Sequence, residues 1–441
     1  MTSTEHLASP TTVDPDDVLR ARTLLLASGR RTPHEEVDAY RILSRVTPAA
    51  YLPRLSEALV RLSHERGYQD HHAARLAVLE EAVAAARAVD TAEPQRAELL
   101  HRALDGCQRQ LYVLGRRAEG LAVRAEMVAV GRAQGEASGD PEDTVRGLPV
   151  WAAGLSEEGR HAEAADAMTE WVTASRPGGS RSGALAWYLL QWIAALDAAG
   201  RTDEALAACA ELVRGEAHDA AADRGPMACH FYALIEYARM LDAHGRHGDE
   251  AAAARHEALV LLTELAATGE RTSWSGYQST YWAVVFTLSS ARSERQRAPL
   301  PHPPFGAGRH HWSHAVQERY VDRRAELQEE ADALARRADD APDAMAELIE
   351  VHRLLTVRSA VRWEQCSHCC PHDEVRPLFD EGIRLARRLT AHDPSGGTAA
   401  LVAALMDRAT FRTAAKEFGA ALDDLQEALR VLGEPDRCEP A

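Results

Sequence analysis

Apolar residues recur along most of this chain at the three- to four-residue spacing of amphipathic helices, in pairs of segments separated by a glycine. The pair around Gly200 shows the pattern most clearly. Its aliphatic and small residues fall on one face of each segment, at Leu189, Ile193 and Leu196 before the glycine and at Ala205, Cys209 and Leu212 after it. This spacing predicts two helices that pack against each other through these faces.

The turn between the two predicted helices carries its own signals. Gly200 can adopt the left-handed conformation that ends a helix. Thr202 is expected to be the N-cap of the next helix. Asp203 and Glu204 would then lie in the first turn, where the helix dipole favours carboxylates.

The same template fits around three further glycines, Gly115, Gly159 and Gly245. Leucines stand eleven and four positions before every one of the four glycines: Leu104 and Leu111, Leu148 and Leu155, Leu189 and Leu196, Leu234 and Leu241. Four copies in register indicate an internal repeat, in which each helical hairpin buries its apolar face only by stacking on its neighbours.

With these features the chain resembles the tetratricopeptide-repeat proteins. Ala152, Gly159 and Ala164 match that family's small residues and turn glycine, as do Ala238 and Gly245. Successive turn glycines are 44, 41 and 45 positions apart, against about 34 in the standard repeat, so longer helices are expected. The resemblance implies an all-α, right-handed superhelix of about seven to eight helical hairpins with a concave groove.

The pattern divides the chain into five segments. The stretch RAPLPHPPFGAG at 297–308 cannot be helical, because its prolines lack an amide hydrogen and clash with the preceding turn. The expected organisation is a disordered start (1–15), helical repeats (16–292), an inserted loop rich in proline and histidine (293–311), further helical repeats (312–432) and a frayed acidic tail (433–441).

Composition narrows the class of protein. The formal net charge of −17 argues against general nucleic-acid binding. No apolar run is long enough to span a bilayer, and the start of the chain lacks a secretory signal, so we expect a soluble cytoplasmic protein. Seven cysteines, an odd number, favour reduced thiols over a disulfide framework. Lys416 is the only lysine, which together with the abundant alanine and arginine indicates the codon usage of a high-GC, actinobacterial genome.

The family resemblance also implies which residues face the concave groove. The mapped positions are Arg102, Asp105, Arg109, Tyr112, Arg146, Trp187, Tyr232, Arg239 and Asp242. Arginine and aromatic residues dominate interface hot spots, and arginine would favour an acidic or C-terminal peptide group. The alternative is that Trp187 and Tyr232 belong to the core between repeats, and the aromatic run from Trp274 to Phe286 carries the same ambiguity.

Two clusters offer metal-binding side chains. Cys366 and Cys369 have a spacing that suits one Zn²⁺, and His368, Cys370 and His372 could complete the ligands. The alternatives are a redox-sensitive thiol group and, most simply, a helix–helix turn that happens to carry cysteines. The second cluster is formed by histidines that are expected to be solvated loop residues rather than ligands or pH sensors: His302, His310, His311 and His314.

No phosphate-binding loop, dinucleotide-binding glycine pattern, GxSxG or HExxH motif is present in the sequence. The leading hypothesis is therefore a non-enzymatic scaffold or regulator that binds a protein or peptide, without nucleic acid, membrane or cofactor. A metal- or small-molecule-responsive regulator that uses residues 366–372, and an unrecognised helical enzyme, remain as alternatives. The sequence leaves the oligomeric state open.

Overall fold

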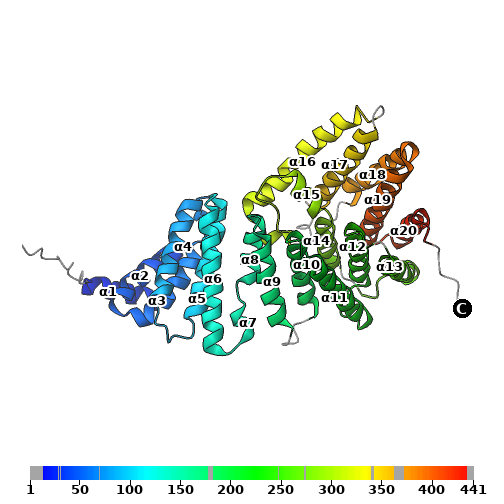
Figure 1. Ribbon diagram of the computed structural model, residues 1–441. Coiled ribbons are helices and arrows are strands. Elements are labelled where there is room, and N and C mark those ends of the chain that lie inside the picture. The colour runs from blue at the N-terminus through cyan, green and yellow to red at the C-terminus, as the bar shows by residue number, and fades with distance from the viewer. Residues whose placement is uncertain are drawn as a thin grey trace, which may run out of the picture. The chain divides into compact units, whose positions relative to one another are not determined.

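The computed structural model describes residues 13–27, 29, 31–68, 70–176, 182–246, 248–272, 275–338, 342–361 and 372–434. Over these residues the protein is all-α, and consecutive helices pack against one another through most of the chain (Figure 1). Contacts divide the chain into two units, residues 1–147 and 148–441. This boundary falls inside the segment 16–292 that the sequence pattern treats as one array.

Unit 1 is a sequential stack of helices: α1 (Pro15–Leu26), α2 (Pro33–Val46), α3 (Pro48–Leu62), α4 (His72–Arg87), α5 (Arg96–Val113), α6 (Arg117–Ser138) and α7 (Pro141–Thr144). Helix α2 begins with a capping box. The Thr32 hydroxyl accepts a hydrogen bond from the Glu35 amide at 3.2 Å, and the Glu35 carboxylate accepts one from the Thr32 amide at 2.9 Å. These bonds satisfy amide groups that have no partner inside the helix.

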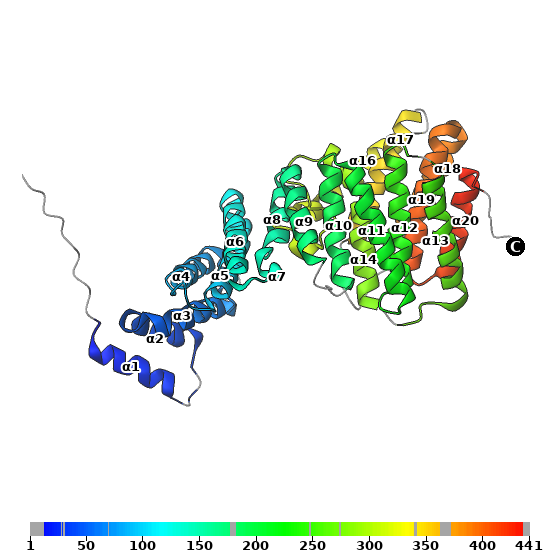
Figure 2. The ribbon, with the colours of Figure 1, turned by 60° about the horizontal axis from the view of Figure 1, so that its bottom comes forward.

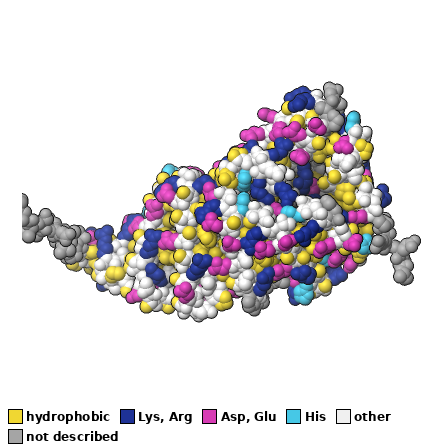
Figure 3. All heavy atoms as spheres, in the orientation of Figure 1, with side chains coloured by type: hydrophobic (Ala, Val, Ile, Leu, Met, Phe, Trp, Pro, Cys, Tyr) yellow, Lys and Arg dark blue, Asp and Glu magenta, His cyan; other side chains and the backbone are white. Residues whose placement is uncertain are grey.

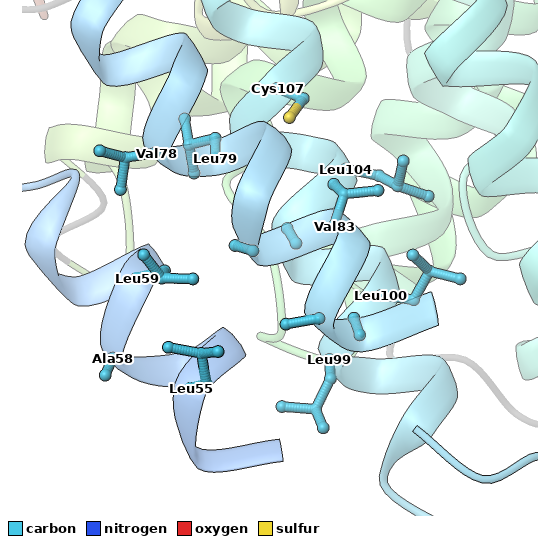
Figure 4. Packing of buried hydrophobic residues seen from close by; sticks show 14 of the residues in the cluster. Leu55, Ala58, Leu59, Val78, Leu79, Val83, Leu99, Leu100, Leu104 and Cys107 are labelled. Carbon is cyan, nitrogen blue, oxygen red and sulfur yellow. The ribbon is translucent and has the colours of Figure 1, made fainter. Parts of the chain in front are cut away.

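The core of unit 1 is built by α3, α4 and α5, which contact one another pairwise. All three helices contribute aliphatic side chains to one core cluster, and Figure 4 labels six of them: Leu55, Leu59, Leu79, Val83, Leu100 and Leu104. All six are buried. Because each helix contributes only one apolar stripe, this core forms only when the helices stack.

Unit 2 begins with a row of antiparallel helices: α8 (Leu148–Glu157), α9 (His161–Ser175), α10 (Ser182–Ala198), α11 (Thr202–Ala221), α12 (Met227–Ala243) and α13 (Asp249–Thr268). Each packs against the next, and Figure 2 shows them side by side. Three hairpins result, namely α8–α9, α10–α11 and α12–α13.

The turn glycines confirm the prediction made for Gly200. Gly115, Gly159, Gly200 and Gly245 have φ angles between +69° and +76°, in the left-handed region. The next residue along donates its amide to a carbonyl five positions back in every case, as Arg201 does to Leu196 at 2.9 Å. The prediction for Thr202 was wrong: Arg201 occupies the N-cap and makes no side-chain cap bond.

The second half of unit 2 contains α14 (Ser275–Leu288), α15 (Ala291–Arg297), α16 (His314–Ala335), α17 (Pro342–Val361), α18 (His372–His392), α19 (Pro394–Ala414) and α20 (Phe418–Leu432). Helices α16 to α20 again pack in sequence, but α14 does not follow this order. It contacts α10 and α12 on one side and α17 and α19 on the other, and α20 contacts α13. The two halves of unit 2 therefore close on each other around α14.

Helix α15 ends at Arg297, the first residue of the proline-rich stretch. The rest of the stretch is free of α-helix, as its prolines predict, and the next α-helix begins at His314. The stretch lies in the fold rather than in solvent. Phe305 and Trp312 are buried, and a Cβ on Gly306 would lie 2.2 Å from the carbonyl oxygen of Leu190. Only glycine allows this approach to α10.

The stretch also binds α8. The amide of His302 donates to the carbonyl of Glu157 at 3.1 Å, and the amide of Ser313 donates to the Glu157 carboxylate at 2.7 Å. Contrary to the expectation of a solvated loop, His302 is 8% exposed and its Nε2 lies 2.7 Å from the carbonyl oxygen of Ala298. None of the helices in the described ranges is long and apolar enough to cross a membrane.

Candidate functional site

Four of the predicted groove residues come together on unit 1. Arg102, Asp105 and Arg109 follow Glu98 along one stripe of α5, at the three- and four-residue intervals that place side chains on one helix face. Arg102 pairs with Glu98 at 3.0 Å and Arg109 pairs with Asp105 at 2.8 Å. Arg146, from the segment after α7, reaches the same stripe and pairs with Glu98 at 2.5 Å.

Two residues that the sequence did not single out extend this stripe. Arg75, in the first turn of α4, donates to Nδ1 of His64, just beyond α3, at 3.1 Å. The pKa of Arg75 is lowered by burial and by the positive charge of Arg109. The pKa of His64 is lowered by burial and by the positive charges of Arg75 and Arg109. Within the described part of unit 1, no carboxylate bonds to Arg75, and its Nε is buried without a partner.

We call these residues the α5 surface: His64, Arg75, Glu98, Arg102, Asp105, Arg109 and Arg146. Its arginine–carboxylate pairs are exposed and are each worth about 0.2–1 kcal/mol, so a ligand can replace them at little cost. On the face of the molecule that Figure 3 shows, basic and acidic side chains are interspersed. Arg75 differs from Arg102, Arg109 and Arg146 of the α5 surface in having no carboxylate partner among the described residues.

Tyr112, the fifth groove residue predicted in unit 1, belongs to the core. It is 1% exposed. The guanidinium groups of Arg124 and Arg117 lie 4.1 Å and 5.1 Å from its ring centroid. A Cβ on Gly120 would lie 2.8 Å from the ring, so the absence of a side chain at Gly120 makes room for Tyr112. Gly120 stands five positions after Gly115, as Ala164 does after Gly159.

In unit 2 the predicted groove aromatics contact α14. The ring centroid of Trp187 lies 5.5 Å from that of Tyr277 and 5.6 Å from that of Tyr281. Tyr232 is fully buried, with its ring 6.5 Å from Tyr281. Of the two interpretations that the sequence left open, the structure supports the core for Tyr232, and it places Trp187 against the protein's own helix.

Arg239 takes part in a buried ion cluster rather than in an open groove. It pairs with Asp407 of α19 at 2.8 Å and lies 3.4 Å from Glu236. Arg353 of α17 donates to the same Asp407 at 2.7 Å. Burial raises the pKa of Glu236 to about 7, although the nearby arginines oppose the shift. The cluster joins α12, α17 and α19.

Asp242, the last predicted groove residue, pairs with Arg255 at 2.8 Å. Arg255 is 4% exposed and also binds the carboxylate of Glu434 at 2.5 Å. The start of the predicted tail is thus attached to α13, and residues 435–441 lie outside the described residues.

The predicted Cys/His cluster cannot be placed. Cys366, His368, Cys369 and Cys370 lie outside the described residues, and His372 is described only as the first backbone position of α18. Among the residues that are described, no group of three or more His, Cys, Asp or Glu side chains is arranged to hold a metal.

Two of the other loop histidines have described side chains, His311 and His314. His314 pairs with Glu318 at 3.2 Å, and His311 is exposed. The side chain of His310 is not among those described. Three described cysteines, Cys107, Cys209 and Cys229, are buried free thiols, and burial raises the pKa of each.

Neither a protein-family model nor a curated protein matches the sequence. The resemblance to tetratricopeptide repeats therefore depends on the repeated hairpins and their turns alone.

Proposed function

We propose that this protein is a tetratricopeptide-like helical-repeat protein, with the right-handed superhelix of that family, that binds an acidic peptide segment of a partner protein on the α5 surface. The repeat assignment is supported by the recurring left-handed glycine turns. It is also supported by arginine–glutamate pairs that recur immediately after these turns: Arg116–Glu119, Arg160–Glu163 and Arg201–Glu204.

The observation that carries the binding proposal is the group of Arg75, Arg109 and His64. Two guanidinium groups and an imidazole lie at one place on the surface, and only Arg109 has a carboxylate partner. A carboxylate from a ligand would remove the mutual repulsion of Arg75 and Arg109 and form charge-assisted hydrogen bonds. Arg102, two turns from Arg109 on α5, and Arg146, which reaches the same stripe from the segment after α7, would bind further acidic side chains of an extended peptide.

Unit 1 supports this proposal better than unit 2 does. The first helices of the hairpins in unit 2, α8, α10 and α12, are covered by α14 and by the stretch between Ala298 and Ser313. A peptide that used Trp187 or Tyr232 would have to displace these elements. The α5 surface needs no such rearrangement, because Arg102 and Arg109 are already exposed.

The proposal is tested by fluorescence anisotropy with a labelled hexaglutamate peptide and the full-length protein. Arg75→Ala and Arg109→Ala are each expected to weaken binding at least tenfold, which corresponds to about 1.4 kcal/mol. Arg45→Ala is the matched control, because Arg45 is an exposed arginine at the end of α2. The proposal is contradicted if the unaltered protein and the three variants bind hexaglutamate with equal affinity. It is also contradicted if the unaltered protein binds a hexalysine peptide as tightly as hexaglutamate.

A further inference from the structure

A pocket of ≈ 320 Å³ lies between α17 and α19, over α18, in unit 2. Figure 1 shows these three helices next to one another. Small residues of α18 and α19 line the space between α17 and α19: Gly382, Gly396, Ala400, Ala403 and Ala404. Apolar side chains form most of the wall: Ile349, Leu378, Phe379, Leu389, Ala400 and Ala403. The volume is at the lower end of the range of small-molecule sites, about 300–1,000 Å³.

His352 gives this apolar pocket an unused polar group. Its side chain lines the pocket and the residue is 7% exposed. No hydrogen bond joins its ring to any residue that the structure describes, although the charges of Glu381 and Arg384 act on it. Burial lowers the pKa of His352, so the ring is neutral near pH 7 and offers one N–H donor and one acceptor. Both ring nitrogens are therefore available to a ligand in the pocket.

Arg353, the next residue on α17, lines the same pocket and supplies positive charge. It donates to the carboxylate of Asp407 at 2.7 Å and 3.3 Å, and to the hydroxyl and carbonyl oxygens of Ser289 at 2.8 Å and 3.3 Å. These bonds use four of the five guanidinium N–H groups. One N–H on Nη1 is left for a further acceptor.

The charges around Arg353 leave room for one more negative group. Asp407 is shared by Arg353 and Arg239. Glu236, the other carboxyl of the cluster, is fully enclosed, and its desolvation disfavours the charged form. The cluster therefore holds two arginines, one carboxylate shared by both, and Glu236, whose pKa of about 7 keeps it partly protonated near neutral pH. Two further carboxylates line the pocket and have partners of their own: Glu350 lies 3.8 Å from Arg297, and Asp393 accepts a hydrogen bond from the amide of Ser395 at 3.1 Å.

We propose that this pocket binds a small monocarboxylate with an apolar body, whose carboxylate accepts hydrogen bonds from Arg353 and from the ring of His352. The hydrocarbon part lies along the apolar walls of α17, α18 and α19. The ligand is a small molecule rather than a peptide because the volume admits little more than one aliphatic or aromatic group. This site is separate from the α5 surface and does not depend on it.

Isothermal titration calorimetry of the full-length protein with octanoate and octanamide tests the site. The two probes share an apolar chain, and only octanoate carries the negative charge. We expect saturable binding of octanoate and at least tenfold weaker binding of octanamide. No saturable binding of octanoate, or equal affinity for both probes, overturns the proposal.

Gly382→Leu locates the binding site. A Cβ at Gly382 would contact only the His352 ring, at 3.7 Å, so the longer side chain extends into the pocket without meeting the backbone. Gly215→Leu is the matched control, because Gly215 is an exposed residue of α11 with open space around it. Octanoate binding should weaken at least tenfold in Gly382→Leu and stay unchanged in Gly215→Leu; equal binding by both variants contradicts the location.

His352→Phe tests the polar end while keeping a ring of similar size in the pocket. We expect octanoate binding to weaken at least fivefold, and the preference for octanoate over octanamide to shrink, because one hydrogen bond to the carboxylate is lost. Thermal melting followed by circular dichroism shows whether each variant is folded. Should Gly382→Leu fail to fold, Ala403→Leu fills the pocket from α19 and carries the same expectation. Unchanged binding in His352→Phe overturns the assigned role of the ring.

Discussion

The carboxylate of Glu157, at the end of α8, accepts a 2.7 Å hydrogen bond from the backbone amide of Ser313, 156 positions further along the chain. Glu157 is fully buried, and its own carbonyl oxygen accepts a second bond from the amide of His302. One residue therefore fixes both ends of the proline-rich stretch against the first hairpin of unit 2. The stretch is part of the fold and lies against α8 and α10.

Glu157→Ala should loosen this attachment. The amide of Ser313 would be left buried without its carboxylate partner, which costs about 1–3 kcal/mol. Hydrogen exchange measured by mass spectrometry should show faster exchange in peptides that cover 298–313. Glu163→Ala, which removes an exposed carboxylate from α9, serves as the control and should leave this exchange unchanged. Equal protection in both variants would contradict the role of Glu157.

The repeated turns make a matched pair of glycine substitutions informative. Gly200→Ala places a side chain at φ +76°, which costs about 1–2 kcal/mol although nothing crowds the position. Gly215→Ala in the middle of α11 should stabilise by about 0.5–1 kcal/mol, because alanine is the better helix former. Urea unfolding of the two variants should move the midpoint in opposite directions. A shift in the same direction would show that the turn does not require glycine.

The pH dependence of stability should reveal the buried Glu216 of α11. Burial, aided by the charge of Asp219, raises the pKa of Glu216 to about 8 from an ordinary value of 4.5. The folded protein therefore holds this proton over a pH range in which the unfolded chain has released it. Its contribution to stability is complete below about pH 4.5 and is lost as the pH rises toward 8, by at most about 1.4 kcal/mol per pH unit.

Glu216→Gln isolates this effect from that of other titrating groups. The variant should lose less stability than the unaltered protein when urea unfolding is compared at about pH 5 and about pH 8. Identical losses in the two proteins would show that Glu216 does not titrate in this range.

Local features of the fold were accessible from the sequence. The spacing of Leu189, Ile193 and Leu196 predicts α10, and the glycine after them predicts its end, because both depend on neighbouring residues only. Thr202 shows the limit of this reasoning. A threonine can cap a helix, but the backbone turn through Gly200 and Arg201 sets where the next helix begins.

The long-range arrangement of unit 2 was not accessible. The aromatic run of α14 predicts a helix with buried residues, but periodicity does not say which helices cover it. The pair of Arg239 and Asp407 joins positions 168 residues apart, so no local pattern shows that Arg239 has a partner. For the same reason the sequence left open whether Tyr232 faces a groove or belongs to the core, and the structure places it in the core.

The candidate site in unit 1 was predicted in part. Arg102, Asp105 and Arg109 were found because they share one helix and one face. Arg75 and His64 were missed because they belong to other segments, α4 and the turn after α3, which meet α5 only through the stacking of unit 1. The stacking of α3 on α5, which the repeat implies, is the only signal that could have pointed to them.

The most direct test of the binding proposal is the salt dependence of hexaglutamate affinity, compared between the unaltered protein and the double variant Arg75→Ala/Arg109→Ala. Affinity for the unaltered protein should fall steeply as sodium chloride rises from about 0.05 M to about 0.5 M, since salt screens exposed charges. The double variant should bind weakly with a shallow dependence. Two proteins with the same affinity and the same slope would contradict the assignment of the α5 surface as the peptide-binding site.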